Sequence, residues 1–86
     1  MEIDITDRAK EDLAFWKKSG NVSVQNKITK LIESILVTPY SGIGNPEPLK
    51  YELTGAWSRR ISQEHRLIYE IEENKITILS LRGHYE

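Results

Sequence analysis

The residues whose types could support a reaction gather in the second half of this 86-residue chain. Glu47 stands between two prolines, Arg66 opens a strand-like segment, and His84 lies close to the end of the sequence. A carboxylate, a histidine and a guanidinium are the groups needed to cleave a phosphodiester without a metal. One group takes a proton, one gives a proton, and the cation holds the phosphate.

Glu47 lies in the sequence Pro46-Glu47-Pro48. Proline restricts the backbone on both sides, so the carboxylate is presented at a low entropic cost. Composition alone favours the simpler alternative, a surface glutamate in a proline-rich turn.

The two histidines, His65 and His84, are too few and too far apart to suggest a zinc site. Histidine is the natural residue to protonate a leaving oxygen near neutral pH, and His84 is the candidate. The alternative for His84 is a tail residue that lies in solvent or caps the sheet. His65 is interpreted as structural.

Arginines 59, 60 and 66 could bind a phosphate through paired hydrogen bonds. Arg59 and Arg60 are adjacent and therefore point to opposite faces of a strand. The alternative for each arginine is a cross-strand ion pair with Glu52, Glu64 or Glu70. Lys50 could contact phosphate and Tyr51 could stack on a base, although a strand lysine is usually solvated.

Length and composition indicate one domain over residues 1–86, with 38% hydrophobic and 29% charged residues. We find no membrane-spanning run and no basic signal sequence, and the absence of cysteine fits a reducing cytoplasm. The net charge of −1 argues against non-specific nucleic-acid binding. Residues 50–66 nevertheless carry more bases than acids, where a phosphate site could use them.

Hydrophobic spacing predicts a short strand at Ile3 and Ile5, then a helix from Thr6 or Asp7 to about residue 18. A turn follows, and Ser23 is expected to cap a second helix that ends before Pro39. The aromatic residues are expected in the core rather than as stacking platforms: Phe15, Trp16 and Trp57.

Strand-like spacing begins after the proline-rich loop. Residues 51–53 and 57–61 flank a predicted hairpin turn at residues 54–56, and residues 66–72 and 75–82 flank a second turn at Glu73-Asn74. The last strand is apolar on both faces, which predicts a central position. The order β-α-α-β-β-β-β is typical of an α+β fold with a helical hairpin over a mostly antiparallel sheet.

Four segments together resemble the YoeB family of bacterial toxins, within the wider RelE/ParE superfamily. They are residues 38–50 with the Pro-Glu-Pro motif, residues 53–61, residues 64–69 and the terminal His84-Tyr85. The resemblance spans essentially the whole chain and is densest between Thr38 and Tyr69.

The resemblance implies a RelE-like, microbial-RNase-like fold and the toxin component of a type II toxin–antitoxin system. Members of this family are ribosome-associated endoribonucleases that cleave mRNA and are held inactive by a cognate antitoxin. It implies Glu47 as general base, His84 as general acid and Arg66 as the group that stabilises the transition-state phosphate. Three further residues match positions that contact phosphate or RNA: Lys50, Arg60 and Tyr85.

In that mechanism a ribose 2′-hydroxyl attacks the adjacent phosphorus and leaves a 2′,3′-cyclic phosphate, so the substrate must be RNA. No cofactor or metal is expected. The expected partners are the antitoxin, mRNA and the ribosome in the cytoplasm, and a homodimer is left open. Two alternatives on the same scaffold are a non-catalytic ParE-like gyrase inhibitor and a regulatory module that binds an antitoxin. A binding protein needs no acid and no base, so the complete residue set argues against both.

Overall fold

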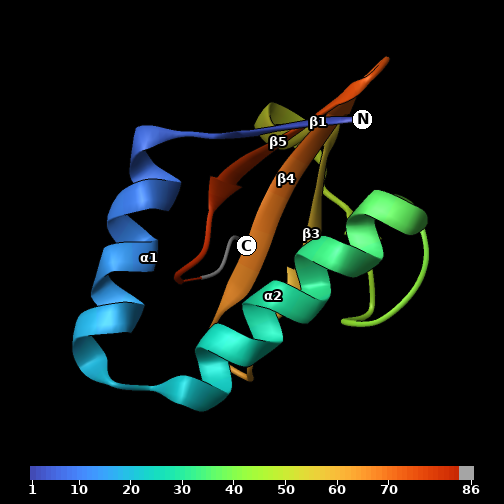
Figure 1. The fold of residues 1–86 in the computed structure, drawn as a ribbon. Helices are drawn as coiled ribbons and strands as arrows, with labels where there is room; N and C mark the ends of the chain where they lie inside the picture. The colour runs from blue at the N-terminus through green and yellow to red at the C-terminus, as the bar shows by residue number, and fades with distance from the viewer. Residues whose placement is uncertain (84–86) are drawn as a thin grey trace.

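The computed structural model describes residues 1–83, and His84, Tyr85 and Glu86 lie outside the described residues. Two helices, α1 (Asp7–Ser19) and α2 (Val22–Val37), pack on a five-stranded sheet (Figure 1). The remaining elements are β1 (Glu2–Ile5), β2 (Glu47–Pro48), the 3-10 turn η1 (Tyr51–Leu53), β3 (Ala56–Arg60), β4 (Arg66–Glu72) and β5 (Lys75–Ser80). The α+β class and the order of helices and strands are confirmed.

The two helices follow each other through a very short link. Thr6 caps α1, because its hydroxyl accepts a hydrogen bond from the backbone N–H of Ala9 at 3.1 Å. Gly20 ends α1 in the left-handed conformation, with φ of 72°. The prediction of Ser23 as the second cap is wrong: Asn21 accepts from the Val24 N–H, so Ser23 lies inside α2. No helix within residues 1–83 has both the length and the apolar character needed to cross a membrane.

The sheet has the strand order β1-β5-β4-β3-β2. β1 pairs with β5 in parallel, and the other neighbours are antiparallel. β5 therefore has a partner on each side, as its apolar sequence predicted. Ile5 of β1 packs against the core, whereas Ile3 remains 37% exposed.

The predicted strand at residues 51–53 is wrong, and so is the hairpin turn at residues 54–56. Tyr51 has a φ of 58°, a left-handed conformation that an extended strand does not contain, and residues 51–53 form η1 instead. The edge strand is β2, two residues that include Pro48 and pair with Ser58 and Trp57 of β3. Proline is tolerated there because, among residues 1–83, no strand pairs with the outer side of β2.

The core lies between the helices and one face of the sheet. It contains residues from α1 (Ala9, Trp16), from α2 (Val24, Ile28, Leu31, Ile35) and from the sheet side (Ile61, Leu67, Tyr69, Ile76, Ile78, Leu81). Trp16 is buried and Trp57 packs against this cluster, as expected. Phe15 is 43% exposed, contrary to expectation, and the Arg82 guanidinium lies 3.9 Å from the centre of its ring.

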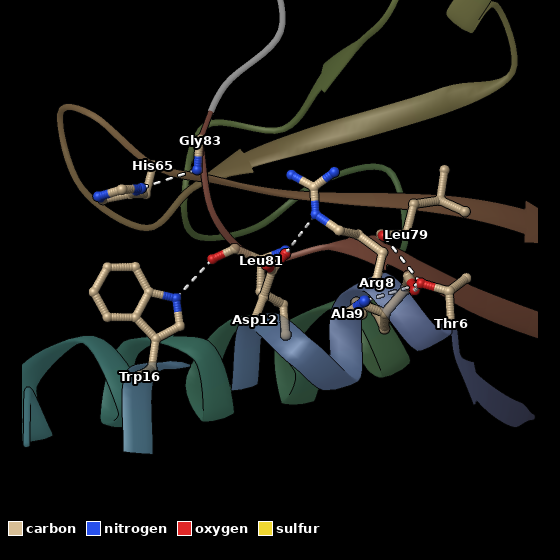
Figure 2. Close-up of polar contacts among 10 residues, drawn as sticks. Thr6, Arg8, Ala9, Asp12, Trp16, His65, Leu79, Leu81 and Gly83 are labelled. Atoms are coloured by element: carbon tan, nitrogen blue, oxygen red, sulfur yellow. Dashed lines mark hydrogen bonds and ion pairs between the residues drawn. The ribbon is translucent and has the colours of Figure 1, made fainter. Parts of the chain in front are cut away.

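Polar contacts fasten α1 to the end of β5 and to the residues beyond it (Figure 2). Asp12, 5% exposed, accepts the backbone N–H of Leu81 at 2.9 Å. The indole N–H of Trp16 donates to the Leu81 carbonyl at 2.9 Å, and the Thr6 hydroxyl donates to the Leu79 carbonyl at 3.0 Å. These contacts fix the path of the chain towards its C-terminal end.

Asp12→Ala tests this attachment. The substitution leaves the buried N–H of Leu81 without its acceptor, so we expect the free energy of unfolding to fall by about 1–3 kcal/mol. Glu11→Ala, an exposed position on the same helix, is the control and should change stability by less than about 0.5 kcal/mol. Urea unfolding measures both, and equal losses in the two variants would contradict the proposed attachment.

Candidate active site

Glu47 lies on the edge strand β2 with its side chain exposed to solvent. Its carboxylate Oε1 accepts a hydrogen bond from the side-chain amide of Asn45 at 3.0 Å. Asn45 has a φ of 53°, a left-handed conformation that asparagine adopts more readily than most residues. The carboxylate is thus oriented by a neighbour and remains accessible.

Strand pairing brings Glu47 onto the same sheet face as two of the predicted cations. Glu47 pairs with Ser58, and Arg60 lies two residues further along β3, so its side chain points to the same side. Arg60 in turn pairs with Arg66 of β4. From the strand spacing and rise, the Cα atoms of Glu47 and Arg66 are about 12 Å apart. Side chains of this length can meet a single phosphodiester between them.

The opposite face of these strands packs against the helices. Arg59, Leu67 and Tyr69 alternate with the candidate residues and are completely buried. Arg59 reaches Ser34 on α2, and Leu67 and Tyr69 belong to the core cluster. The candidate residues therefore lie on the face of the sheet that the helices do not cover.

Arg66 is half-buried at the start of β4. Its Nη1 donates to three carbonyl oxygens of the β3–β4 loop: Ser62 at 2.9 Å, Gln63 at 3.3 Å and His65 at 3.3 Å. These bonds fix the Nη1 end of the guanidinium. Within residues 1–83 its Nε and Nη2 have no hydrogen-bond partner. This arrangement suits a cation that must be fixed before an anion arrives.

Arg60 and Lys50 are both exposed. The backbone N–H of Arg60 donates to the Gly44 carbonyl at 2.7 Å, which ties the end of β3 to the loop before Glu47. Lys50 precedes η1, two residues beyond β2. Both cations therefore belong to segments that adjoin Glu47.

His84 and Tyr85 lie outside the described residues. The chain leaves the described region at Gly83, whose carbonyl accepts the backbone N–H of Arg66 at 2.8 Å. The N–H of Gly83 donates to Nδ1 of His65 at 2.9 Å. Residues up to 83 thus run directly beside Arg66.

Arg59 has a different role from its neighbour Arg60. It is completely buried and spans from the sheet to the end of α2. Its guanidinium donates five hydrogen bonds to neutral oxygens: Tyr69 Oη (3.0 Å), Ser34 Oγ (2.8 Å), Ile43 O (3.1 Å), Thr38 O (2.6 Å) and Ser41 O (2.7 Å). The cation thereby fixes residues 38–43, the segment that leads to Glu47.

Two glycines allow this loop to close on Arg59. Gly42 and Gly44 have φ values of 115° and 83°, which favour glycine. A Cβ at Gly42 would lie 2.5 Å from Ser34 Oγ, and one at Gly44 would lie 2.6 Å from Leu31 Cδ2. The loop can therefore keep this conformation only if residues 42 and 44 carry no side chain.

The role of Arg59 was not predicted from the sequence, although a signal for it is present there. Trp57 and Ile61 flank it at two-residue intervals, so strand alternation assigns Arg59 to the apolar face. The expected ion pairs to glutamate are not found: within residues 1–83 the single ion pair is Arg8–Asp12 at 3.4 Å. Backbone carbonyls take the place of carboxylates around Arg59.

The comparisons with known proteins identify the family and the fold of this chain. A sequence model of a family described as YoeB-like toxin of bacterial type II toxin–antitoxin system matches residues 5–85. The chain belongs to the YoeB toxin family. It is accordingly a toxin of the type II toxin–antitoxin class.

Among curated relatives, Toxin YoeB of Mycobacterium bovis is 48% identical over 75 residues, covering 87% of each chain. Among solved structures, a YoeB/ParE toxin from Agrobacterium tumefaciens superimposes with a TM-score of 0.94 at 36% identity, covering 99% of this chain and 100% of that one. A YoeB–YefM complex from Staphylococcus aureus gives a TM-score of 0.88 at 41% identity, covering 99% and 98%. The fold of this chain is therefore that of solved YoeB toxins.

Arg59→Met tests the buried cation. The variant leaves several oxygens without a donor, and we expect the free energy of unfolding to fall by about 3 kcal/mol or more. Arg60→Met, at the exposed neighbouring position, should change it by less than about 0.5 kcal/mol. Chemical denaturation of the pair measures the contrast, and similar values for both variants would refute the role of Arg59.

Tyr69, which is hydrogen-bonded to Arg59, makes the free energy of unfolding depend on pH. Burial raises the pKa of its phenol above the ordinary value of 10.0, while the hydrogen bond and charge of Arg59 oppose the rise. As the pH rises, the phenol of the unfolded chain therefore loses its proton at a lower pH than the phenol of the folded protein. The stabilisation of the fold by neutral Tyr69 is present below pH 10 and declines as the pH rises further.

Tyr69→Phe removes this titration together with two hydrogen bonds, the one that the hydroxyl donates to the Pro39 carbonyl and the one that it accepts from Arg59 Nε. We expect the free energy of unfolding of the wild type to exceed that of the variant by about 1–3 kcal/mol near neutral pH. The difference should narrow between about pH 9 and about pH 11, where free tyrosine ionises. Unfolding free energies across this range measure it, and a constant difference would contradict the raised pKa.

Proposed function

We propose that this toxin is an endoribonuclease that cleaves mRNA on the ribosome by general acid–base catalysis. The observation that supports it best is the common position of Glu47, Arg60 and Arg66 on the helix-free face of the sheet. The Glu47 carboxylate, a possible proton acceptor, shares this face with the two cations. Gly83, the residue before His84, is hydrogen-bonded to the backbone of Arg66.

In the proposed reaction Glu47 takes the proton from a ribose 2′-hydroxyl, and that oxygen attacks the adjacent phosphorus. His84 protonates the departing 5′-oxygen, so the products are a 2′,3′-cyclic phosphate and a 5′-hydroxyl. Arg66 stabilises the charge on the phosphate oxygens, with Lys50, Arg60 and Tyr85 contacting the RNA. A proton-transfer group contributes ~10²–10⁴ in rate, and a pre-oriented charge contact about 3–4 kcal/mol.

The proposal includes protein partners. The relatives from Staphylococcus aureus have been solved as a YoeB dimer and as YoeB–YefM complexes. We infer that this chain binds a cognate antitoxin of the same kind in the cytoplasm and can form a homodimer. The exposed carboxylate and cations of the helix-free face are the groups that an inhibitor must cover to stop the reaction.

Glu47→Gln tests the general base. The amide retains an oxygen that can accept from Asn45 but cannot take a proton, so we expect cleavage of mRNA on programmed ribosomes to slow by ~10²–10⁴. Glu52→Gln, an exposed position in η1, is the matched control and should cleave as the wild type does. Single-turnover rates with saturating toxin measure both, and full activity of Glu47→Gln would refute the assignment.

His84→Gln and the chemistry of the product ends test the other half of the reaction. The variant should be slowed to a similar extent, because no group remains to protonate the leaving oxygen. Wild-type fragments should carry 2′,3′-cyclic phosphates, and 3′-hydroxyl ends would exclude attack by the 2′-oxygen. Growth inhibition without any cut mRNA would favour a binding mechanism such as that of ParE toxins.

A further inference from the structure

Residues 81–83, between the end of β5 and His84, are held from two sides (Figure 2). From α1, Asp12 and Trp16 bind the N–H and the carbonyl of Leu81. From the β3–β4 loop, His65 binds the N–H of Gly83, and the Arg66 N–H binds its carbonyl. The backbone N–H and carbonyl groups of Leu81 and Gly83 are therefore tied to elements far away in the sequence.

The imidazole of His65 is itself fixed in place. Its ring packs edge-on against the Trp16 ring, with the centroids 4.8 Å apart and the planes at 84°. Its backbone carbonyl accepts the N–H groups of Ile61 at 2.9 Å and Ser62 at 3.2 Å. The ring of His65 therefore presents Nδ1 to Gly83 from a supported position.

The hydrogen bond defines the protonation of this histidine. Nδ1 accepts the Gly83 N–H at 2.9 Å, and only an imidazole nitrogen without a proton can accept. While it accepts this bond, the ring carries its proton on Nε2, a tautomer assigned from the hydrogen-bond partner. The backbone carbonyl of His65 already receives three donors, so the side-chain Nδ1 is the acceptor that this residue offers to the Gly83 N–H.

We propose that His65 is a positioning residue for the reaction proposed above. It acts through Gly83 to set the direction in which the chain continues to His84, and it touches neither substrate nor reacting atoms. The inference rests on the proposed function in one respect: that His84 is the general acid. Gly83 has a φ of 79°, a conformation that other residues rarely adopt, so its peptide orientation depends on these anchors.

Variants with side chains of similar size distinguish the effect of losing the hydrogen-bond acceptor Nδ1 from the effect of losing the packing of the ring. His65→Asn can place an oxygen near the position of Nδ1, His65→Leu has a similar shape with no acceptor, and His65→Gln reaches instead towards Nε2. Loss of the anchor should reduce kcat for cleavage by about 10- to 100-fold, since small misplacements of a catalytic group have effects of this order. Asn should retain most of the activity, Leu and Gln should lose it, and KM should change little.

Glu64→Gln is the matched control, because this exposed neighbour makes no hydrogen bond to residues 81–83. It should cleave like the wild type. Wild-type kcat in His65→Leu and His65→Gln would overturn the proposal. Equal loss in His65→Asn and His65→Leu would also overturn it, because the acceptor would then be irrelevant.

A double variant tests whether His65 acts through His84. If it does, His65→Leu combined with His84→Gln should cleave no more slowly than His84→Gln alone. A further 10- to 100-fold loss in the double variant would show an independent route and overturn the proposal. A purely structural role would produce that further loss.

Amide hydrogen exchange provides a readout that needs no RNA. The Gly83 N–H should exchange slowly in the wild type and in His65→Asn, and at least tenfold faster in His65→Leu and His65→Gln. If the wild type fails to cleave mRNA, the proposed function fails while this result still reports on the anchor. If cleavage occurs but Gly83 exchange is unchanged in every variant, the anchor is refuted and the proposed function stands.

Discussion

The buried guanidinium of Arg59 is the interaction on which the site depends. A charge removed from water must be compensated, and here five hydrogen bonds to neutral oxygens do so. Three of the acceptors are backbone carbonyls between Thr38 and Ile43, so the loop after α2 can fold in only one way around the cation. Glu47 follows this loop directly. The position of the candidate base is therefore a consequence of satisfying one buried charge.

A second constraint acts on the other end of the site. Asp12, Trp16 and His65 bind the backbone of residues 81–83, and the carbonyl of Gly83 lies against Arg66. Both constraints use side chains on the helix side or in loops: one places the segment before Glu47, and the other places residues 81–83. This division leaves the helix-free face to a carboxylate and cations that lie outside the hydrophobic core. Such separation permits a preorganised site at little expense to stability.

Much of the fold follows from local patterns in the sequence. The helical spacing from Val24 to Ile35 and the turn at Glu73-Asn74 depend on nearby residues, and both were predicted correctly. The edge strand β2 was not predicted, because its two residues, one of them a proline, are too few to show an alternation of apolar and polar residues. Only their pairing with β3 defines them. The cap at Asn21 was missed because Gly20 ends α1 in a left-handed turn, which brings the second helix forward by two residues.

The residue types of the candidate site could be predicted from the sequence, but which arginine is buried and structural and which is exposed could not. Arg59 and Arg60 are identical and adjacent, yet one is completely buried and the other is exposed. Strand alternation separates them, and the identity of the buried face depends on α2, which packs there from elsewhere in the chain. The same pairing explains how a chain of net charge −1 can bring two cations together at one end of this face. Arg60 and Arg66 lie opposite each other on neighbouring strands, so the local charge depends on register rather than on composition.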